Sequence, residues 1–310
     1  MKKISIITPC FNEEKNVPLI VEEIRKVMNT LPYIYEHILI DNCSTDLTWE
    51  EIKKASAEDD KIKGIRNARN FGPLRSVAHA MFNGDGDCII ALACDLQEPP
   101  SLIPEFIQKW EEGYKVVFGQ KTESDESKIM YSIRGLYYDI IARFSEIPQF
   151  KQTTGFGLYD KEVVKMIESL HEPEPSLRHI IAELGYKVAF IDYCQPKRIY
   201  GKSKFSLFFY FDYAFNTLIN TSQLPLKMAV SWGFFTSFVS FAIGLVYLIW
   251  KCIDWMHFDM GLAPVLIGLF FIGGVLLMFI GIIGEYIGEI LRRTKIRPLV
   301  IESERINFDK

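Results

Sequence analysis

The sequence predicts an α/β domain followed by a pair of membrane-spanning helices. In the first two thirds of the chain, short apolar runs alternate with longer stretches of helical character, which is the pattern of a sheet with helices on both faces. Beyond residue 225 this alternation stops, and two long runs with almost no charge follow. With 310 residues, the chain is long enough for one sizeable domain and a smaller part.

The first part of the chain is interpreted as strands and helices in alternation. An apolar run that ends in polar or turn residues marks each strand, and a polar or acid-led stretch marks each helix. The last of these helices begins behind Pro99 and Pro100, which act as a start signal. The predicted strands are residues 3–9, 36–42, 62–67, 87–95 and 114–120, and the predicted helices are residues 12–30, 45–58, 73–83 and 101–111.

Polar side chains follow the predicted strands at the point where each strand ends. The first strand runs into TPCFNEE, the second into DNCSTD and the strand from Asp87 into ACDLQ, while NARNFG leads into a helix. Ligands of such sheets bind beyond the carboxyl ends of the strands. We therefore expect these segments to form the binding site.

Two of these segments offer contacts to a nucleotide. Asp41 ends an apolar strand, where it can accept hydrogen bonds from the base or the ribose. Ser44 and Asp46 in the same turn are expected to serve as turn and helix-cap residues. Asn70 opens a turn at a helix start, where backbone N–H groups could meet an anion.

The segment ALACDLQEPP carries the candidate metal ligands. Asp95 and Gln97 offer one carboxylate and one amide oxygen, and both are hard ligands. Mg²⁺ and Mn²⁺ often take only one or two protein carboxylates and complete their shell with substrate phosphates and water. One Asp, one amide oxygen and a diphosphate are therefore sufficient for either ion.

A basic segment, KRIYGKSKF, lies at the end of the first part of the chain. Its cations flank a glycine and a serine, and a glycine among cations suits a loop that closes over phosphates. Most basic loops are simply solvated, so this segment alone is a weak indication of phosphate binding. Its position directly before an amphipathic stretch strengthens the indication. The residues concerned are Arg198, Gly201, Lys202, Ser203 and Lys204.

Residues 226–250 and 262–284 form the two apolar runs, and each is long enough to cross a bilayer core of about 30 Å as a helix. The alternative is a pair of buried core helices, which rarely reach this length without a polar face. The connector is short, so both ends of the predicted hairpin lie on the same side. Residues 291–310 follow as a basic tail, and the positive-inside rule places this tail and the first domain, residues 1–204, in the cytoplasm.

Residues 205–225 are predicted to form an amphipathic helix between the two parts. Aromatic and aliphatic side chains recur there at three- and four-residue spacing and make one helical stripe. We expect this helix to lie in the membrane interface. The alternative is a helix packed on the first domain.

Composition and charge argue against several classes of protein. The net charge of −4 gives none of the basic excess of nucleic-acid-binding proteins, so no nucleic-acid partner is expected. The six cysteines and five histidines are scattered, without a CxxC pair, a zinc spacing or an HExxH motif. The first apolar run is too short for a signal peptide and is expected to be the first strand.

Taken together, these stretches resemble a known family. The matching segments are TPCFNEEKNV, LIDNCSTD, NARNFG, CDLQEPPSLIPEF, VVFGQK, GFGLYDKEVV, RIYGKSKF and the hairpin, which cover essentially the whole chain. The chain looks like a polyprenyl-phosphate glycosyltransferase of the dolichol-phosphate-mannose-synthase-like branch of the inverting family-2 glycosyltransferases. It is most similar to bacterial bactoprenol-phosphate sugar transferases with two C-terminal membrane helices. The resemblance implies a GT-A (Rossmann-like) nucleotide-sugar domain, an interfacial helix, a transmembrane hairpin and a homo-oligomer, in the form of a tetramer.

The resemblance also implies roles for individual residues. Nucleotide binding is expected at Pro9, Asn12, Glu14 and Asp41, together with the turn at Asn70. The metal, Mg²⁺ or Mn²⁺, is expected on Asp95 and Gln97. Phosphates of the donor or the lipid are expected to meet Lys121, Arg198, Ser203 and Lys204, and the catalytic set is expected to be Asp95, Arg198 and Lys204.

Three departures from the family pattern bear on the chemistry. Ala93 replaces the first acid of the Asp-x-Asp motif. Asn42 and Cys43 replace the second Asp and the Gly of the usual DDGS motif. Gly155 replaces the acid that is proposed as catalytic base in the family. A sugar hydroxyl needs deprotonation as it attacks, whereas a phosphate monoester has a second pKa of about 6 and is already largely dianionic at neutral pH. Gly155 is therefore consistent with a lipid-phosphate acceptor. Asp160, which lies near by in the sequence, is expected to cap a helix.

Three hypotheses of function follow. The leading one is a membrane-bound enzyme that moves a sugar from a nucleotide diphosphate sugar, by analogy a UDP-sugar, to undecaprenyl phosphate, giving a polyprenyl-phosphate sugar for modification of cell-envelope glycans. A polysaccharide synthase with a hydroxyl acceptor is the second, but the QxxRW motif usual in such enzymes does not occur in the sequence. A catalytically silent scaffold that binds a nucleotide sugar is the third, and Ala93 and Gly155 favour it.

Overall fold

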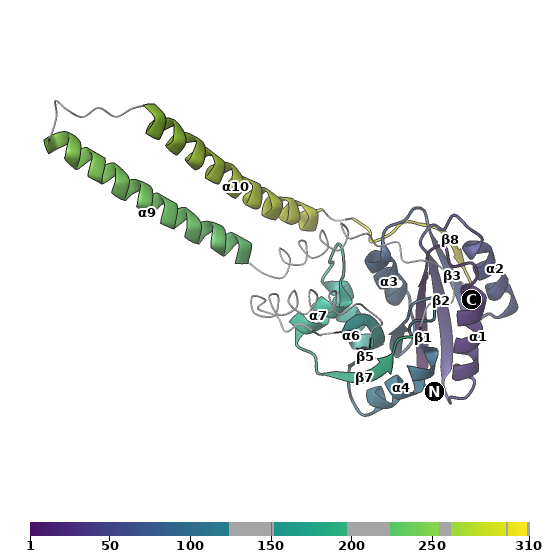
Figure 1. Cartoon of the computed structure of the whole chain (residues 1–310). Coiled ribbons are helices and arrows are strands. Elements are labelled where there is room, and N and C mark those ends of the chain that lie inside the picture. Colours follow the sequence, from purple (N-terminus) through teal and green to yellow (C-terminus); the bar gives the residue numbers. More distant parts are fainter. Residues whose placement is uncertain (124–149, 151, 197–223, 254–261, 296, 309–310) are drawn as a thin grey trace. The chain divides into compact units, whose positions relative to one another are not determined.

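The computed structural model describes residues 1–123, 150, 152–196, 224–253, 262–295 and 297–308 (Figure 1). These residues belong to two compact units. The first unit contains the described residues up to 196 together with residues 297–308. The second consists of two long helices, α9 (Leu224–Ile253) and α10 (Leu262–Thr294). The interfacial helix expected over residues 205–225 lies almost entirely outside the described residues.

The first unit is built on an eight-stranded mixed sheet with the order β7-β5-β6-β4-β1-β2-β3-β8. Four neighbouring strands, β3, β2, β1 and β4, run parallel, and β6 and β8 pair antiparallel at either side of them. The strands are β1 (Lys3–Cys10), β2 (Ile34–Asp41), β3 (Ile62–Asn67), β4 (Cys88–Ala91), β5 (Val116–Glu123), β6 (Thr153–Asp160), β7 (Val188–Cys194) and β8 (Glu302–Ile306). The α/β fold predicted from the sequence is confirmed.

Helices cover both faces of this sheet. One face packs against α1 (Val17–Met28), α2 (Thr48–Glu58) and α4 (Ile103–Glu111), which follows the short 3₁₀ turn η1 (Pro100–Leu102). The other face packs against α3 (Pro73–Phe82), α6 (Lys161–Ser169) and α7 (Leu177–Leu184). Because the central strands are buried on both faces, they read in the sequence as nearly continuous apolar runs.

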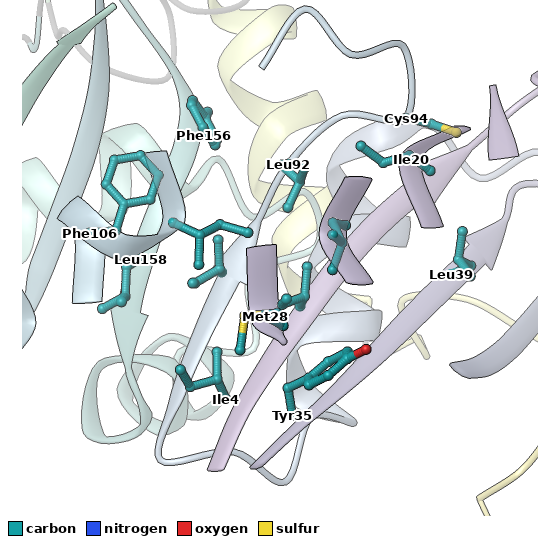
Figure 2. Packing of buried hydrophobic residues seen from close by; sticks show 14 of the residues in the cluster. Ile4, Ile20, Met28, Tyr35, Leu39, Leu92, Cys94, Phe106, Phe156 and Leu158 are labelled. Atoms are coloured by element: carbon teal, nitrogen blue, oxygen red, sulfur yellow. The ribbon is translucent and has the colours of Figure 1, made fainter. Parts of the chain in front are cut away.

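The core on the α1 side shows how the strand period distributes side chains. Ile4 and Ile6 of β1 are fully buried on this side, whereas Ile7 is buried in the cluster on the opposite face. This is the alternation that a strand imposes on successive side chains. Figure 2 shows Ile4 in the same packed cluster as Met28 of α1 and Tyr35 of β2. The cluster fixes the central strands, and with them the loops at their carboxyl ends.

Two predicted helices begin later than expected. The first begins at Val17 rather than at residue 12, and the second begins at Thr48 rather than at residue 45. The residues before each helix belong to loops whose side chains bond to one another, and a polar loop of this kind has no periodicity that separates it from a first helical turn. The strand predicted over residues 87–95 also ends early, at Ala91, so that Asp95 lies in the loop that follows.

The C-terminal segment forms a strand, which corrects the expectation of a basic tail over residues 291–310. The helix α10 continues to Thr294, and β8 then pairs antiparallel with β3 at the edge of the sheet. The first unit therefore extends beyond the boundary expected at residue 204. The sequence ESERI hides this strand, because both of its faces carry charged side chains that bond to helices on either side of the sheet.

The helices α9 and α10 are long and apolar enough to cross a membrane, by length and composition. Their most apolar described segments are Leu226–Val246 and Phe271–Thr294, and almost none of either segment is buried within the chain. A core helix of a soluble protein would be mostly buried. The two helices are therefore candidate membrane spans.

A buried carboxylate at the amino-terminal half of β2 organises the edge of the sheet opposite to the loops described below. Glu36 accepts hydrogen bonds from Lys3 Nζ at 2.7 Å, from the backbone N–H of Asp85 at 2.7 Å and from Ser5 Oγ. Lys63 Nζ lies 2.8 Å from the same carboxylate. Burial alone would raise the pKa of Glu36, but these hydrogen bonds outweigh it and lower the pKa to about 2.

We expect Glu36→Gln to lower the free energy of unfolding by about 2 kcal/mol at neutral pH, because the ammonium groups of Lys3 and Lys63 lose their buried charge partner. The folded pKa lies below the unfolded one, so this contribution is present at pH 7 and disappears as the pH falls from about 4.5 toward about 2. Urea unfolding of the first unit at pH 7 and pH 3 measures the effect. The control is Glu111→Gln, since Glu111 bonds Lys2 at 2.9 Å but is 41% exposed; equal losses for the two variants would contradict the prediction.

Candidate functional site

Three loops meet at the carboxyl edge of the parallel strands, after β1, β2 and β4. Each contains one residue other than glycine in the left-handed region: Asn12 with φ 57°, Cys43 with φ 61° and Leu96 with φ 60°. Such conformations cost on the order of 1 kcal/mol or more each and persist where the surroundings hold them, which is common at binding and catalytic sites. The strained backbone thus marks the same edge as the polar segments of the sequence.

The loops after β1 and β2 are joined by side-chain hydrogen bonds. Asn12 donates its backbone N–H to Ser44 Oγ at 2.9 Å and accepts from the N–H of Thr45 at 2.9 Å. Glu14 Oε2 accepts from the N–H of Leu47 at 3.1 Å. Asn12 and Glu14, expected at the nucleotide, therefore already hold one loop against the other.

The turn after β2 is held by two carboxylates, Asp41 and Asp46. Asp46 Oδ1 accepts from the N–H of Thr48, the first residue of α2, at 3.0 Å. Ser44 donates its N–H to Asp41 Oδ1 at 3.0 Å. Ser44 therefore lies in a turn, as predicted, and the side chain of Asp41 closes that turn. The predicted helix cap is not found, because Leu47 occupies the N-cap position of α2 and α2 has no side-chain cap.

Asp41 is the most deeply buried carboxylate of this edge, with no exposed surface. Its Oδ2 atom has no hydrogen-bond partner among the residues that the structure describes, although Arg66 Nε lies 3.5 Å away. Burial raises the pKa of Asp41, and the bonds from Ser44 and the charge of Arg66 oppose this rise. A buried acceptor without a donor is costly, so this oxygen is suited to a ligand that brings an N–H or O–H group. Pro9 lies on β1 directly before Cys10, the residue in register with Asp41.

A network of asparagines fixes the loop after β3. Asn42 donates from Nδ2 to Asn70 Oδ1 at 2.9 Å, and its Oδ1 accepts from Asn67 Nδ2 at 3.1 Å and from the N–H of Phe71 at 2.9 Å. Asn70 Oδ1 also accepts from the N–H of Gly72 at 2.9 Å. The side chain of Asn70, which was expected to contact the nucleotide, thus has a structural role in this loop. The network also explains Asn42, because this position uses both a donor and an acceptor.

We expect Asn42→Asp to destabilise the protein by about 1–2 kcal/mol, because a carboxylate oxygen would face Asn70 Oδ1. A flip of the Asn70 amide would only move the conflict to the N–H of Gly72. Thermal unfolding measures the loss, with Asn29→Asp as the control because Asn29 is exposed at the end of α1. An Asn42→Asp protein as stable as the control would contradict the network as drawn.

The loop after β4 holds the candidate metal ligands. Asp95 is 7% exposed, and its Oδ1 accepts from the N–H of Gln97 at 3.2 Å. Both residues offer hard oxygens, a set that fits Mg²⁺ or Mn²⁺ if substrate phosphates complete the shell. In the described part of the chain, no group of three or more His, Cys, Asp or Glu side chains is placed to hold a metal ion. A metal here would therefore depend on its substrate for most of its ligands.

Glu98 is a site residue that the sequence interpretation missed. Its Oε2 accepts from the N–H of Ala93 at 2.7 Å, and its Oε1 accepts from Thr154 Oγ1 of β6 at 2.7 Å. It thereby ties the Asp95 loop to β6. Burial raises the pKa of Glu98, and the hydrogen bonds from Thr154 and from the N–H of Ala93 oppose this rise. The run QEPP could have drawn attention to Glu98, but no spacing rule identifies its partner on β6.

Gly155 has φ +100°, a conformation that L side chains rarely adopt. Its carbonyl accepts from Tyr159 Oη at 2.7 Å, which fixes this turn of β6. Asp160 caps α6, because its Oδ1 accepts from the N–H of Glu162 at 3.0 Å, so the predicted cap is confirmed. Asp160 is in register with Cys88 at the start of β4, at the edge opposite to the loops. The chain therefore offers no carboxylate at either position that would act as a base beside the Asp95 loop.

Of the phosphate-binding residues expected from the sequence, only Lys121 falls within the described residues. Lys121 lies on β5, and its N–H donates to the carbonyl of Gln152 at 3.1 Å. Arg198, Ser203 and Lys204 lie outside the described residues. The structure thus brings the loops of Asn12, Asp41, Asn70 and Asp95 to one edge of the sheet.

Comparison with known proteins agrees with this architecture. Residues 5–167 match the model of glycosyl transferase family 2. A protein of Synechocystis sp. called an uncharacterized glycosyltransferase is 30% identical over 97% of this chain and 95% of its own length. The bactoprenol glucosyl transferase of Shigella phage SfV is 29% identical over 98% of this chain and 99% of its own length. A putative glycosyltransferase of Bacillus subtilis, CsbB, is 30% identical over 99% of this chain and 93% of its own length. The chain therefore belongs to glycosyl transferase family 2 and is a glycosyltransferase with a GT-A-like, Rossmann-like sheet followed by two apolar helices.

Proposed function

We propose that this glycosyltransferase is a membrane enzyme that transfers a sugar from a UDP-sugar to undecaprenyl phosphate, with inversion at the anomeric carbon. The product would be a polyprenyl-phosphate sugar for modification of cell-envelope glycans. Relatives similar over nearly the full length, among them bactoprenol glucosyl transferases of Shigella phages, support the lipid acceptor. The observation that carries the donor site is the buried Oδ2 of Asp41, which accepts no hydrogen bond from the described residues and lies at the same sheet edge as the Asp95 loop.

The donor would bind across this edge with its base at Asp41. The ionised carboxylate accepts a hydrogen bond from an imide N–H of a pyrimidine or from a ribose hydroxyl, and the low exposure of the site strengthens that bond. Pro9, Asn12, Glu14 and the turn at Asn70 would line the nucleotide. The hydrogen bonds between these loops fix their shape before the donor arrives, which lowers the entropy cost of binding.

The diphosphate would lie toward the loop after β4. Asp95 and Gln97 would hold Mg²⁺ or Mn²⁺, and such an ion neutralises the charge that develops on the leaving diphosphate. Lys121, Arg198, Ser203 and Lys204 would contact phosphates of the donor or of the lipid, with Asp95, Arg198 and Lys204 as the catalytic set. Cations at these positions stabilise the same developing charge.

The acceptor chemistry fits a site without a base at position 155. An undecaprenyl phosphate oxygen attacks the anomeric carbon as a nucleophile that is already ionised at neutral pH, because its second pKa is about 6. The sugar–diphosphate bond breaks, and the diphosphate leaves as the nucleotide. A hydroxyl acceptor would need a group to remove its proton, and Gly155 cannot supply one.

The order of elements along the chain supports a two-span membrane arrangement. Strands before α9 and strand β8 after α10 belong to one sheet, so the chain must return to the side from which it left. Two crossings satisfy this condition, and Arg292 and Arg293 at the end of α10 favour the cytoplasmic side of an inner membrane. The exposed apolar surface of both helices suits lipid and further copies of the chain, as in the homotetramer that the family resemblance suggests.

The proposal is tested by nucleotide release from a panel of UDP- and GDP-sugars. The full-length protein in detergent is assayed with Mn²⁺ or Mg²⁺, with and without undecaprenyl phosphate. We expect release that needs one UDP-sugar, the metal and the lipid phosphate together, which would also identify the sugar. If nucleotides bind but no donor gives lipid-dependent release, the protein is the silent binder that Ala93 and Gly155 would favour.

A further inference from the structure

We infer that Glu304, on the strand that follows the second apolar helix, is a positioning residue of the donor site. It acts through Arg66, which lies beside Asp41. The C-terminal strand is then a part of the nucleotide-binding half of the enzyme. This inference rests on the proposed binding of the donor at Asp41.

Three adjacent strands place an acidic, a basic and a second acidic side chain in one row. Asp41 of β2 is in register with Arg66 of β3, and Arg66 is in register with Glu304 of β8. Residues in register on neighbouring strands project from the same face of the sheet. Arg66 Nε lies 3.5 Å from Asp41 Oδ2, and Arg66 Nη1 lies 3.8 Å from Glu304 Oε1. The guanidinium is therefore shared between a fully buried carboxylate and a half-exposed one.

Trp49 of α2 holds Glu304 in this row. Its indole Nε1 donates to Glu304 Oε2 at 2.8 Å, and the Arg66 guanidinium lies 5.7 Å from the centre of an indole ring. Trp49 is 2% exposed and packs in the core, so it is a fixed anchor. One carboxylate oxygen of Glu304 thus bonds a rigid donor while the other faces Arg66.

A bulge in β8 supplies a natural comparison residue. The register shifts between Arg66, opposite Glu304, and Asn67, opposite Glu302, so one extra residue separates the two glutamates on β8. Glu302 consequently reaches the other face of the sheet, where it contacts His79 of α3. The two glutamates belong to the same short strand, and Glu304 lies on the face of the sheet that carries Arg66 and Asp41, whereas Glu302 lies on the other.

The position of Arg66 decides whether Asp41 can bind the nucleobase of the sugar donor. At 3.5 Å, Arg66 Nε stabilises the charge of Asp41 without occupying Oδ2 as a close hydrogen-bond donor. Without the opposing charge of Glu304, Asp41 is the acid of the described residues that remains within 4.0 Å of the guanidinium, which can then close on Oδ2. The base would then compete with a side chain of the protein for the same acceptor.

The test is a calorimetric titration of the full-length protein with UDP in the presence of Mn²⁺. We expect Glu304→Gln, which can still accept from Trp49 through its amide oxygen, to weaken UDP binding by about three- to fivefold, as for loss of a half-exposed ion pair. Glu302→Gln should bind UDP like the unaltered protein. In steady-state kinetics, Glu304→Gln should raise the KM for the donor and leave kcat unchanged. A general loss of structure would lower kcat as well.

A double-mutant cycle with Arg66→Gln tests whether Glu304 acts through Arg66. We expect Glu304→Gln to have no further effect on UDP affinity once Arg66 is replaced. Equal affinities for Glu304→Gln and Glu302→Gln, or an undiminished effect of Glu304→Gln without Arg66, would overturn the inference. If the unaltered protein binds no UDP, the proposed donor site fails instead, so the two failures are distinguishable.

Discussion

Replacing Asp95 by Asn is expected to lower sugar transfer about a thousandfold or more, because a metal bound here, which would neutralise the leaving diphosphate, would lose its carboxylate ligand. Asn keeps an oxygen at Oδ1, so the hydrogen bond from the N–H of Gln97 is retained and the loop keeps its shape. The change therefore isolates charge from structure. Nucleotide release at saturating donor and lipid, measured across a Mn²⁺ titration, gives the result.

The matched control is Asp160→Asn. Asp160 makes the same kind of contact, from Oδ1 to an N–H two residues ahead, but it lies at the opposite edge of the sheet. We expect the Asp160→Asn protein to keep its kcat. It should lose some stability, because Asp160 also accepts a hydrogen bond from Trp110 Nε1 at 2.8 Å. Near-normal transfer by Asp95→Asn at any Mn²⁺ concentration would remove Asp95 from the metal site.

Replacing Asp41 by Asn is expected to weaken donor binding about a hundredfold, because a buried acceptor is exchanged for a neutral amide that can turn an N–H toward the base. The amide oxygen can still accept from the N–H of Ser44, so the turn after β2 should remain. Calorimetry with UDP measures the loss. Asp87→Asn is the control, since Asp87 accepts from the N–H of Lys3 at the start of the strands, far from the loops.

The same side chain predicts the pH dependence of donor binding. Burial raises the pKa of Asp41 above its ordinary value. If the ionised form binds the base, UDP affinity is full above this raised pKa and falls as the pH drops through it. The slope should vanish in Asp41→Asn. UDP affinity that is equal in the two proteins and equally independent of pH would show that the base does not bind at Asp41.

The sequence allowed the sheet and the edge that carries the site to be predicted, because both depend on local patterns. Apolar runs such as KISIITP and EHILIDN mark buried strands, and acids and amides at their ends mark the loops. Asp41 and Asp95 were found in this way, and the structure places both at the carboxyl edge. The turn at Ser44 and the cap role of Asp160 also followed from turn and cap chemistry, whereas the cap expected in the turn before α2 was not found.

The contacts that were missed join residues far apart in the chain. Glu304 meets Trp49 and Arg66 only because β8 returns to the sheet after two long helices, and no local period signals that pairing. Glu98 was missed for the same reason, since its partner Thr154 belongs to another strand. The late starts of α1 and α2 arise from bonds between loops, which outweigh the helical character of their sequences.

The proposed acceptor is a lipid phosphate and not an alcohol. The most direct measurement is transfer of a radiolabelled sugar from the preferred UDP-sugar by the full-length protein, with undecaprenyl phosphate and undecaprenol compared side by side. We predict a labelled product from the phosphate alone, because a site with glycine at position 155 relies on a nucleophile that is already ionised. Equal or greater transfer to undecaprenol would contradict the claim, since it would require a base that removes the proton of a hydroxyl group.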